Sequence, residues 1–471
     1  MSIWNDILGL FPILNLSSII LIAIVLKTIL KKSELAIFYI SIFGLIVSLM
    51  SGVLLFEERR SAFSDMILVG GYANYFIILI ALIGILFLLQ TYQFIKSFTN
   101  YSEYLILSLS AILGMMVMSA SIDLVTIFIG LELMSISFYI LAGFNRTDVR
   151  SNESSLKYFL LGAFATGFFL YGIALVYGAT GSTNLLMISQ IQSEAVKVPI
   201  YIIGFVLLLI GFGFKVAAVP FHMWVPDVYE GAPTLSTSIM ATGGKIAAFS
   251  SFMLAFSIPL SMHLKSLTIV VAILAASSMI VGNIFGLAQK SLKRMLAYSS
   301  IAHAGYMLVG MASGTQTGRE GIAFYLMSYA LTNLGAFGVI IFLENKKENL
   351  TYENIAGLGK TQPFAASMLA IFMISLIGIP PFAGFIGKYY LFLSAIEQNM
   401  TWLAIIGVVT SVVSLYYYLR VVVYIYFKES EIDFTIEKSK TTFTSLLVSA
   451  ALILFFGIVP SLILRYTHIL M

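Results

Sequence analysis

The sequence predicts an all-α protein that crosses a membrane many times. Of its 471 residues, 60% are hydrophobic and 10% are charged, and the mean hydropathy is +0.99. Soluble domains carry about 25% charged residues, so the composition excludes an ordinary soluble fold. Apolar runs of about 17 residues or more recur between short charged or Gly/Pro-rich loops, as is typical of transmembrane helices. Two of these runs are too long for one straight helix.

Splitting the runs at their loops gives about fourteen spans. Their predicted limits are 10–30, 35–56, 72–95, 104–121, 123–143, 156–178, 198–230, 234–257, 267–289, 296–312, 321–343, 364–396, 402–426 and 442–464. The first run has no basic segment before it, so we expect a retained span rather than a cleavable signal. Basic residues are concentrated in alternate loops, which places both termini on the outer side of the membrane.

The run 198–230 is the first of the two overlong spans. It has roughly 32 residues, whereas a bilayer core needs only about 20 helical residues. Pro220 lies near its middle, where a proline removes a backbone hydrogen bond and kinks or breaks a helix. Lys215 lies about one turn earlier, and an ammonium at mid-membrane costs at least about 3 kcal/mol. A costly charge beside a costly break indicates an ion or proton site.

The run 364–396 is the second overlong span and repeats these features. Pro380 and Pro381 lie near its middle, and Lys388 follows shortly after. Broken helices at corresponding places in two halves indicate an inverted repeat with its site at the repeat interface. The breaks fall in the seventh and twelfth predicted spans, and this odd offset requires opposite orientations. We expect a three-helix addition (residues 1–100), two five-helix repeats formed by spans 4–8 (101–260) and 9–13 (261–430), and a C-terminal helix (431–471).

Other polar residues also fall at membrane depth. Glu132 lies nine residues after Asp123, which is about 13 Å along a helix. Lys245 is near the middle of its span, and Gly243–Gly244 before it permit close helix packing. His303 lies in the segment SSIAHAGYM. Asp123, at a span edge, is expected to be an interface or capping residue, whereas the other three are candidates for proton transfer.

Buried lysines suit proton transfer because their charge can be tuned. Desolvation disfavours the ammonium, and a nearby carboxylate favours it. A contact between Glu132 and Lys215 that forms and breaks would therefore move protons along a chain of lysines linked by ordered water. A lone intramembrane lysine often makes a local salt bridge or extends to the interface. Three lysines and a glutamate, two of the lysines beside helix breaks, favour a proton path. His222, directly after Pro220, either binds carbonyls freed by the break or relays protons.

The sequence also bears on electron transfer. The chain has no cysteine, which excludes thiolate-ligated iron–sulfur clusters and disulfides within it. Its four histidines are scattered and do not form a paired haem-ligand pattern. Neither a GxGxxG nor a Walker A motif supports a nucleotide site. We therefore expect no cofactor and no metal in this chain.

Three segments identify a family resemblance: FKVAAVPFHMWVPDVYEGAPT, QKSLKRMLAYSSIAHAGYM and GIPPFAGFIGKYYLF. Together they resemble the antiporter-like subunits of respiratory complex I, and the likeness covers about residues 100–430. The chain is most similar to subunit N of bacterial NADH:quinone oxidoreductase. Lys388 follows PPFAGFIG as in subunit N, whereas subunit M resembles it with a glutamate there. The chain also ends soon after its last span, without the long lateral helix of subunit L.

The resemblance implies a fourteen-helix fold with inverted repeats, each forming a proton half-channel. It implies that Glu132 is the glutamate of the fifth helix and that Lys215 is its partner on the broken seventh helix. Lys245 matches the bridging lysine of the eighth helix. Lys388 matches the terminal lysine of the broken twelfth helix, facing the outlet. His303 falls on the helix of the second repeat that corresponds to the one carrying Glu132, which implies a connecting role.

The function implied is that of a non-redox subunit of a proton-translocating oxidoreductase. NADH–quinone electron transfer, with its flavin, iron–sulfur clusters and quinone, would belong to partner subunits. The implied partners are antiporter-like subunit M and small subunits of the K, J and A types, with no nucleic acid. The implied location is the bacterial inner membrane, with both termini on the periplasmic side.

Three alternatives share the same segments: a subunit of a multisubunit Na⁺/H⁺ antiporter, of a membrane hydrogenase, or of a ferredoxin-driven complex. A fourth is a scaffold whose buried charges only hold helices together. Gene neighbours that encode flavin and iron–sulfur proteins favour the oxidoreductase, and neighbours without redox proteins favour the antiporter.

Overall fold

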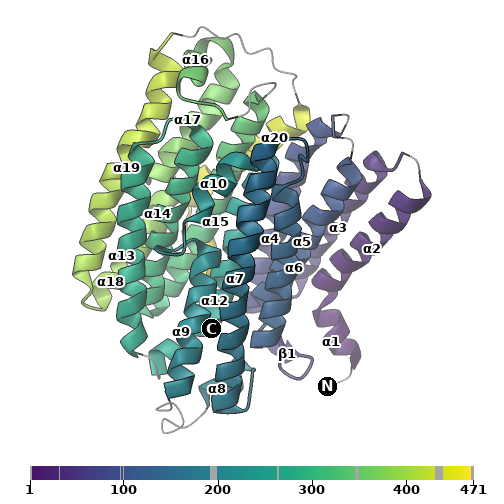
Figure 1. The fold of residues 1–471 in the computed structure, drawn as a ribbon, viewed down its shortest axis with the longest axis vertical. Helices are drawn as coiled ribbons and strands as arrows, with labels where there is room; N and C mark the ends of the chain where they lie inside the picture. The colour runs from purple at the N-terminus through teal and green to yellow at the C-terminus, as the bar shows by residue number, and fades with distance from the viewer. Residues whose placement is uncertain are drawn as a thin grey trace.

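The structure is a computed structural model that describes residues 3–30, 32–95, 97–98, 100–190, 199–262, 265–344, 349–429 and 439–467. Long helices run side by side through the described part of the chain (Figure 1). Within it, twelve helices are long and apolar enough to cross a membrane, or up to thirteen if the bent pair Glu353–Thr361 and Pro363–Ile377 is one span. The prediction of an all-α, polytopic membrane protein is confirmed, and the count of about fourteen spans stays a prediction.

The N-terminal part contains helices and one small hairpin. Its elements are α1 (Ile3–Gly9), α2 (Phe11–Ile29), α3 (Glu34–Leu54), β1 (Arg60–Ala62), β2 (Ile67–Val69), α4 (Gly71–Thr91) and η1 (Tyr92–Phe94). The two strands pair antiparallel with Arg60 opposite Val69, a hairpin that the hydropathy pattern did not predict. In Figure 1, α2 and α3 lie at the right edge of the bundle.

The middle part contains the first predicted break. Its elements are α5 (Tyr101–Ala120), α6 (Leu124–Ala142), α7 (Val149–Thr180), α8 (Leu185–Ser189), α9 (Pro199–Val216), α10 (Trp224–Gly231), α11 (Thr234–Ala241) and α12 (Gly243–Met262). The break in the run 198–230 is confirmed, because α9 ends at Val216 and α10 begins only at Trp224. A further interruption at Thr242, between α11 and α12, was not predicted, and it lies just before Lys245.

The C-terminal part contains the second predicted break. Its elements are α13 (Lys265–Leu287), α14 (Leu292–Ser313), α15 (Gln316–Leu343), η3 (Glu353–Ile355), α16 (Leu358–Thr361), α17 (Pro363–Ile377), α18 (Ala383–Glu397), α19 (Thr401–Phe427), α20 (Lys440–Ile458) and α21 (Ser461–Thr467). The break in the run 364–396 is confirmed between Ile377 and Ala383. The predicted last span, 442–464, is in fact interrupted, because α20 ends at Ile458 and Pro460 precedes a new helix.

Local sequence accounts for the helix ends beside the candidate residues. Asp123 caps α6, and its carboxylate accepts from the backbone N–H of Val125 at 2.9 Å and of Thr126 at 3.0 Å, as predicted. Gly378 ends α17 with φ +84°, a left-handed conformation that favours glycine. A Cβ at Gly378 would lie 3.0 Å from Cδ of Lys388, so the glycine also makes room for this lysine.

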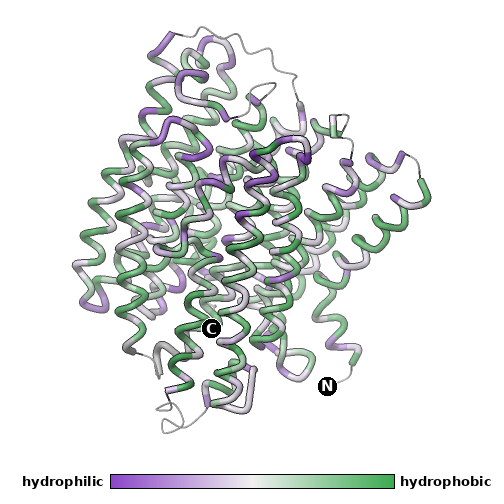
Figure 2. The backbone as a smooth tube through the Cα atoms, in the orientation of Figure 1, coloured by the Kyte–Doolittle hydropathy of each residue, from purple (hydrophilic) through white to green (hydrophobic). Residues whose placement is uncertain are grey.

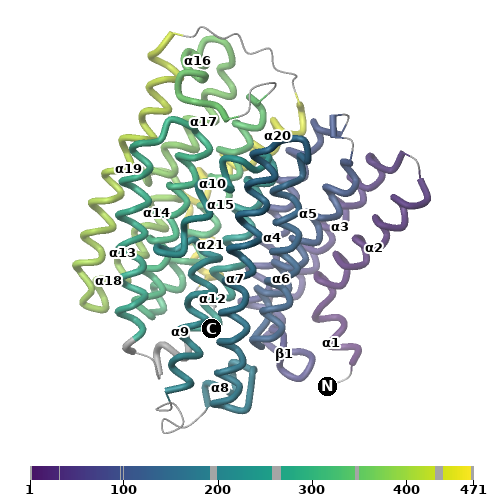
Figure 3. Tube along the Cα trace, viewed as in Figure 1, coloured from purple at the N-terminus to yellow at the C-terminus, as the bar shows by residue number. Residues whose placement is uncertain are grey.

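The chain crosses the bundle from one side to the other, from α2 and α3 on the right to α18 and α19 on the left (Figure 3). Among the spans of the described residues, α11–α12 and α15 are the most enclosed. In their most apolar 18-residue stretches, 100% and 94% of the residues are buried. In contrast, α2, α7 and α20 have 33% buried. Hydrophobic residues cover the lengths of the helices, and hydrophilic residues gather mainly at their ends (Figure 2). The candidate lysines are exceptions to this distribution.

Candidate functional site

Lys215 lies in the last turn of α9 and is 7% exposed. Its Nζ donates to Oγ of Ser135 at 2.7 Å and to the hydroxyl of Tyr139 at 3.4 Å, both in α6. Glu132 lies about one turn before Ser135 and two turns before Tyr139, and its Oε1 accepts from Oγ1 of Thr166 in α7 at 2.8 Å. The expected direct contact between Glu132 and Lys215 is therefore not made in this structure. Ser135 and Tyr139 accept the hydrogen bonds of the ammonium instead.

The backbone freed by the first break has a partner that the sequence did not indicate. The carbonyl of Phe214 accepts from Nε1 of Trp224 at 3.1 Å. The two uses that the sequence left open for His222 were carbonyl binding and a relay. Its Nδ1 is buried without a hydrogen-bond partner among the described residues. The side chain that donates to the carbonyl of Phe214, beside Lys215, is therefore Trp224 and not His222.

Lys245 is the third residue of α12 and is 2% exposed. Its Nζ donates to the carbonyl oxygen of Ser300 in α14. The same ammonium lies 5.4 Å from the ring centre of Tyr329 in α15, a cation–π distance. Lys245 is thus held between three helices by a carbonyl and an aromatic ring.

His303, in α14, is 2% exposed and lies among tyrosines. Its Nδ1 is hydrogen-bonded to the hydroxyl of Tyr325 at 2.5 Å, and its Nε2 to that of Tyr418 at 2.9 Å. Donor and acceptor roles in these bonds depend on the tautomer. The ring centres of Tyr329 and Tyr306 lie 5.3 and 5.5 Å from the imidazole centre. The imidazole can therefore exchange protons with hydroxyls on both of its nitrogens.

Lys388, in α18, is 5% exposed and binds the end of the preceding helix. Its Nζ donates to the carbonyls of Leu376 at 3.1 Å and Ile377 at 2.9 Å, and to Oγ of Ser411 at 2.7 Å. It lies 4.8 Å from the ring centre of Tyr306. Helix ends leave carbonyls without intrahelical partners, and this ammonium satisfies two of them.

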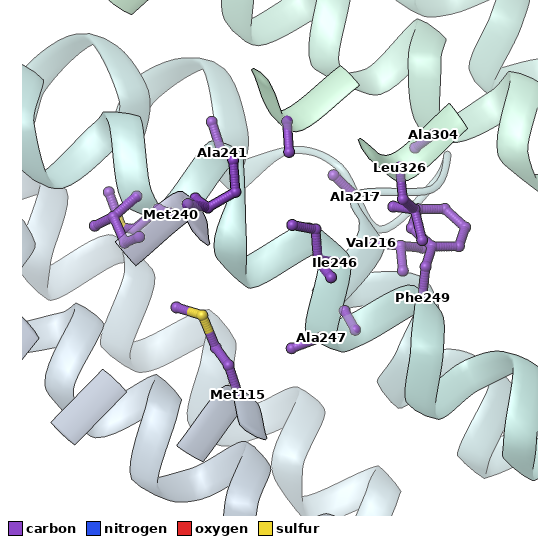
Figure 4. Close-up of a cluster of buried hydrophobic side chains, with 14 of the residues drawn as sticks. Met115, Val216, Ala217, Met240, Ala241, Ile246, Ala247, Phe249, Ala304 and Leu326 are labelled. Carbon is purple, nitrogen blue, oxygen red and sulfur yellow. The ribbon is translucent and has the colours of Figure 1, made fainter. Parts of the chain in front are cut away.

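The five predicted residues fall into two groups. The first polar group consists of Glu132, Ser135, Tyr139 and Lys215; the second consists of Lys245, His303, Tyr306, Tyr325, Tyr329, Lys388 and Tyr418. Tyr329 lies between Lys245 and His303, and Tyr306 between His303 and Lys388. Val216 and Ile246, which directly follow Lys215 and Lys245, belong to one cluster of buried hydrophobic side chains (Figure 4).

The tyrosines of the second polar group were missed by the sequence analysis. Tyrosine in membrane proteins is enriched at the membrane–water interfaces, where its hydroxyl reaches water. Tyr306, Tyr325, Tyr329 and Tyr418 are instead at most 2% exposed and lie within long helices. Tyrosine in the interior of predicted spans, rather than at their ends, is the signal that could have pointed to them.

One cavity adjoins the second polar group, and two others lie at the end of α10. The first, of about 420 Å³, lies between α18 and α19 and is lined by Lys388, Ser411 and apolar side chains such as Val412. The other two, of about 440 and 610 Å³, share Arg150 and Glu230 in their walls. Among the described residues, no group of three or more His, Asp or Glu side chains could hold a metal ion.

Comparisons with known proteins agree with the predicted resemblance. Residues 121–414 match the family model described as NADH:quinone oxidoreductase/Mrp antiporter, TM. The chain is 46% identical to NADH-quinone oxidoreductase subunit N of Trichlorobacter lovleyi, over 93% of this chain and 91% of that relative. It is 44% identical to NADH-quinone oxidoreductase subunit N 1 of Chloroherpeton thalassium, over 98% of each chain.

Solved structures show the same likeness. A chain of respiratory complex I from Thermus thermophilus with bound aureothin is 33% identical, with a TM-score of 0.84 over 96% of this chain and 98% of that one. A chain of the Mrp complex from Dietzia sp. is 19% identical with a TM-score of 0.87, over 100% of this chain and 97% of that one, and shows the fold alone. The chain therefore belongs to the NADH:quinone oxidoreductase/Mrp antiporter family and, within it, to subunit N of the NADH-quinone oxidoreductases.

Proposed function

We propose that this chain moves protons across the membrane as a non-redox subunit of an NADH–quinone oxidoreductase. Besides family membership, the surroundings of the three buried lysines support the proposal. Lys215, Lys245 and Lys388 are each at most 7% exposed, and their ammonium groups bind hydroxyls, carbonyls and aromatic rings. None of the ion pairs between described residues includes any of the three. Charged groups held at membrane depth in this way mark ion and proton paths.

The proposed path runs through both polar groups. Glu132 and Lys215 exchange a proton in the first group, and Lys215 donates to Ser135 while the direct contact is open. Lys245, His303 and Lys388 form the second part, with His303 in a connecting role. Ordered water completes the links between the side chains, since a proton moves only between hydrogen-bonded groups. The Glu132–Lys215 contact gates this path by forming and breaking.

We further propose that residues 101–260 and 261–430 are inverted repeats acting as half-channels, with residues 1–100 and 431–471 as additions and about fourteen spans in all. The packing of the helices supports this pairing. Helix α5 packs against α6 as α13 does against α14, and α7 packs against both α9 and α10 as α15 does against both α17 and α18. The broken helices α9–α10 and α17–α18 then occupy corresponding positions.

The proposed setting is the bacterial inner membrane, with both termini on the periplasmic side. Basic residues from several loops, including Arg150, Lys290 and Arg294, surround one cavity, as expected for the cytoplasmic end under the positive-inside rule. The proposed partners are the antiporter-like subunit M and small subunits of the K, J and A types. Flavin, iron–sulfur clusters and quinone would lie in partner subunits, and no cofactor in this chain.

The test is Lys215→Ala in the assembled complex. We expect NADH-driven proton uptake into sealed vesicles, followed with a pH-sensitive dye, to be abolished, and the amount of assembled complex on native gels to be unchanged. Lys360→Ala, at an exposed residue of the short helix α16, is the matched control and should pump normally. Normal pumping by Lys215→Ala would contradict the proposal. Sodium–proton exchange by this chain without NADH would instead favour the antiporter alternative.

A further inference from the structure

Helix α10 is held by charged residues from both sides at the end of the bundle. The carboxylate of Asp227 accepts from Nζ of Lys157 in α7 at 2.9 Å through one oxygen. Its other oxygen accepts from Nη1 of Arg294 in α14 at 3.0 Å. Arg294 also donates to Glu230, one turn further along α10, at 2.8 Å. One carboxylate thus joins α10 to two helices that lie in different predicted repeats.

Hydrogen bonds to backbone carbonyls reinforce the same attachment. Oγ of Ser154 in α7 donates to the carbonyl of Asp227 at 3.2 Å. Nζ of Lys293 in α14, which is 3% exposed, donates to the carbonyl of Ala232 just after α10 at 2.8 Å. Helix α10 has only eight residues, so these contacts cover much of its length. Its placement therefore depends on α7 and α14.

The opposite end of α10 reaches the Lys215 site. Trp224, its first residue, is 4% exposed and donates to the carbonyl of Phe214, directly before Lys215. The indole also stacks on Tyr158 with ring centres 4.4 Å apart and planes 8° apart. Tyr158 in turn packs edge-on against Tyr139 at 4.8 Å, and Tyr139 is the second hydrogen-bond partner of Lys215. A displacement of α10 would therefore move two groups that contact the end of α9.

We propose that Asp227 is a positioning residue that fixes α10, and through Trp224 the Lys215 site, relative to α14. This inference rests on the proposed function. Helix α14 carries Ser300, whose carbonyl binds Lys245, and also His303. Because Asp227 bonds to α14 through Arg294, the geometry of the first polar group depends on the helix that supports the second. Exposed single ion pairs contribute little, but a carboxylate shared by two cations forms part of a network.

The experiment compares Asp227→Asn with Glu153→Gln in the purified, assembled complex. Glu153 is the matched control, because its ion pair with Lys157, at 2.7 Å, lies within α7 and joins no other helix. We expect Asp227→Asn to lower NADH-driven proton pumping by about three- to ten-fold, the range seen for changes within coupling networks. Glu153→Gln should behave like the wild type. Asp227→Glu, which keeps the charge, should restore much of the pumping.

Hydrogen exchange separates positioning from general loss of structure. In Asp227→Asn we expect faster amide exchange in residues 217–231, with unchanged exchange in α15 and an unchanged KM for quinone. Pumping and exchange like those of Glu153→Gln would overturn the inference. If the Asp227→Asn complex does not assemble, Arg294→Gln is compared with Glu153→Gln instead. In Arg294→Gln, Asp227 keeps its hydrogen bond from Lys157 and loses only the link to α14. Wild-type pumping and exchange in Arg294→Gln would likewise overturn it.

Lys215→Ala in the same preparation keeps the two proposals distinguishable. Normal pumping by Lys215→Ala would contradict the proposed function itself. Loss of pumping in Lys215→Ala together with wild-type behaviour of Asp227→Asn would overturn only the positioning role. The double variant Asp227→Asn/Arg294→Gln should lose less pumping than the product of the two single losses, because both changes remove the shared Asp227–Arg294 contact.

Discussion

The breaks in α9–α10 and α17–α18 satisfy their freed backbone in different ways. After α9, the carbonyl of Phe214 accepts from the backbone N–H of Ala217 and from the neutral indole of Trp224. After α17, the carbonyls of Leu376 and Ile377 accept from Lys388 itself. The first break therefore has a structural cap separate from its lysine, whereas in the second break the lysine is the cap.

This difference separates what the two lysines do for the fold. Among the described residues, the ammonium of Lys215 donates to the side chains of Ser135 and Tyr139 and to no carbonyl, so its proton can leave without uncovering backbone. The neutral amine of Lys388 would still have two N–H groups to donate, but fewer than the three contacts it makes here. A charge change at Lys388 is thus coupled to the end of α17, and a charge change at Lys215 is coupled to α6.

The largest contrast is expected from replacing each lysine with methionine. Lys388→Met leaves the carbonyl of Leu376 without its donor and that of Ile377 with only the hydroxyl of Ser411 at 3.5 Å, which should cost about 2–3 kcal/mol of stability. Lys215→Met replaces a buried charge with an apolar chain of similar size and should stay within about 1 kcal/mol of the wild type. The measurement is the temperature at which the chain is lost from the purified complex. Equal temperatures for the two variants would remove the distinction between the breaks.

Trp224→Phe tests the cap of the first break and should have an intermediate effect. The phenyl ring can still stack on Tyr158 but cannot donate to the carbonyl of Phe214, so we expect a loss of about 1–2 kcal/mol. Trp402→Phe is the matched control, since Trp402 is 42% exposed. Thermal loss of the chain from the complex again provides the measurement. Identical behaviour of the two variants would show that the indole N–H does not support the break.

The smallest effects are expected at the two serine acceptors. Ser135→Ala removes the nearer of the two hydrogen-bond partners of Lys215 and should slow proton pumping by about five-fold. Ser411→Ala leaves Lys388 bound to both carbonyls and should change pumping by less than about two-fold. Initial rates of proton uptake at saturating NADH distinguish the variants. A larger loss in Ser411→Ala would reverse the comparison.

The breaks and the depth of the lysines could be predicted because their causes lie within short stretches of sequence. Pro220 and Pro381 disrupt helices from within the chain, and a run of roughly 30 apolar residues must contain a break. The cap at Asp123 was predictable for the same reason. Glu132, Lys215, Lys245, His303 and Lys388 stood out because ionisable residues are costly in apolar surroundings.

The partners of these residues could not be predicted, because they come from distant parts of the chain. Lys245 binds the carbonyl of Ser300, 55 residues away, and Lys215 binds Ser135, 80 residues away. A carbonyl acceptor leaves no trace in residue type. The expected Glu132–Lys215 contact followed from charge alone. In the structure Lys215 donates to the hydroxyl of Ser135, and Glu132 accepts from the hydroxyl of Thr166.

The central claim is that protons pass through the buried lysines while electron transfer occurs elsewhere in the complex. The most direct measurement is the number of protons moved per NADH oxidised, in sealed vesicles that contain fully assembled Lys215→Ala complex. We expect no proton transfer from this variant. A proton-to-NADH ratio equal to that of the wild type, at equal assembly, would contradict the claim.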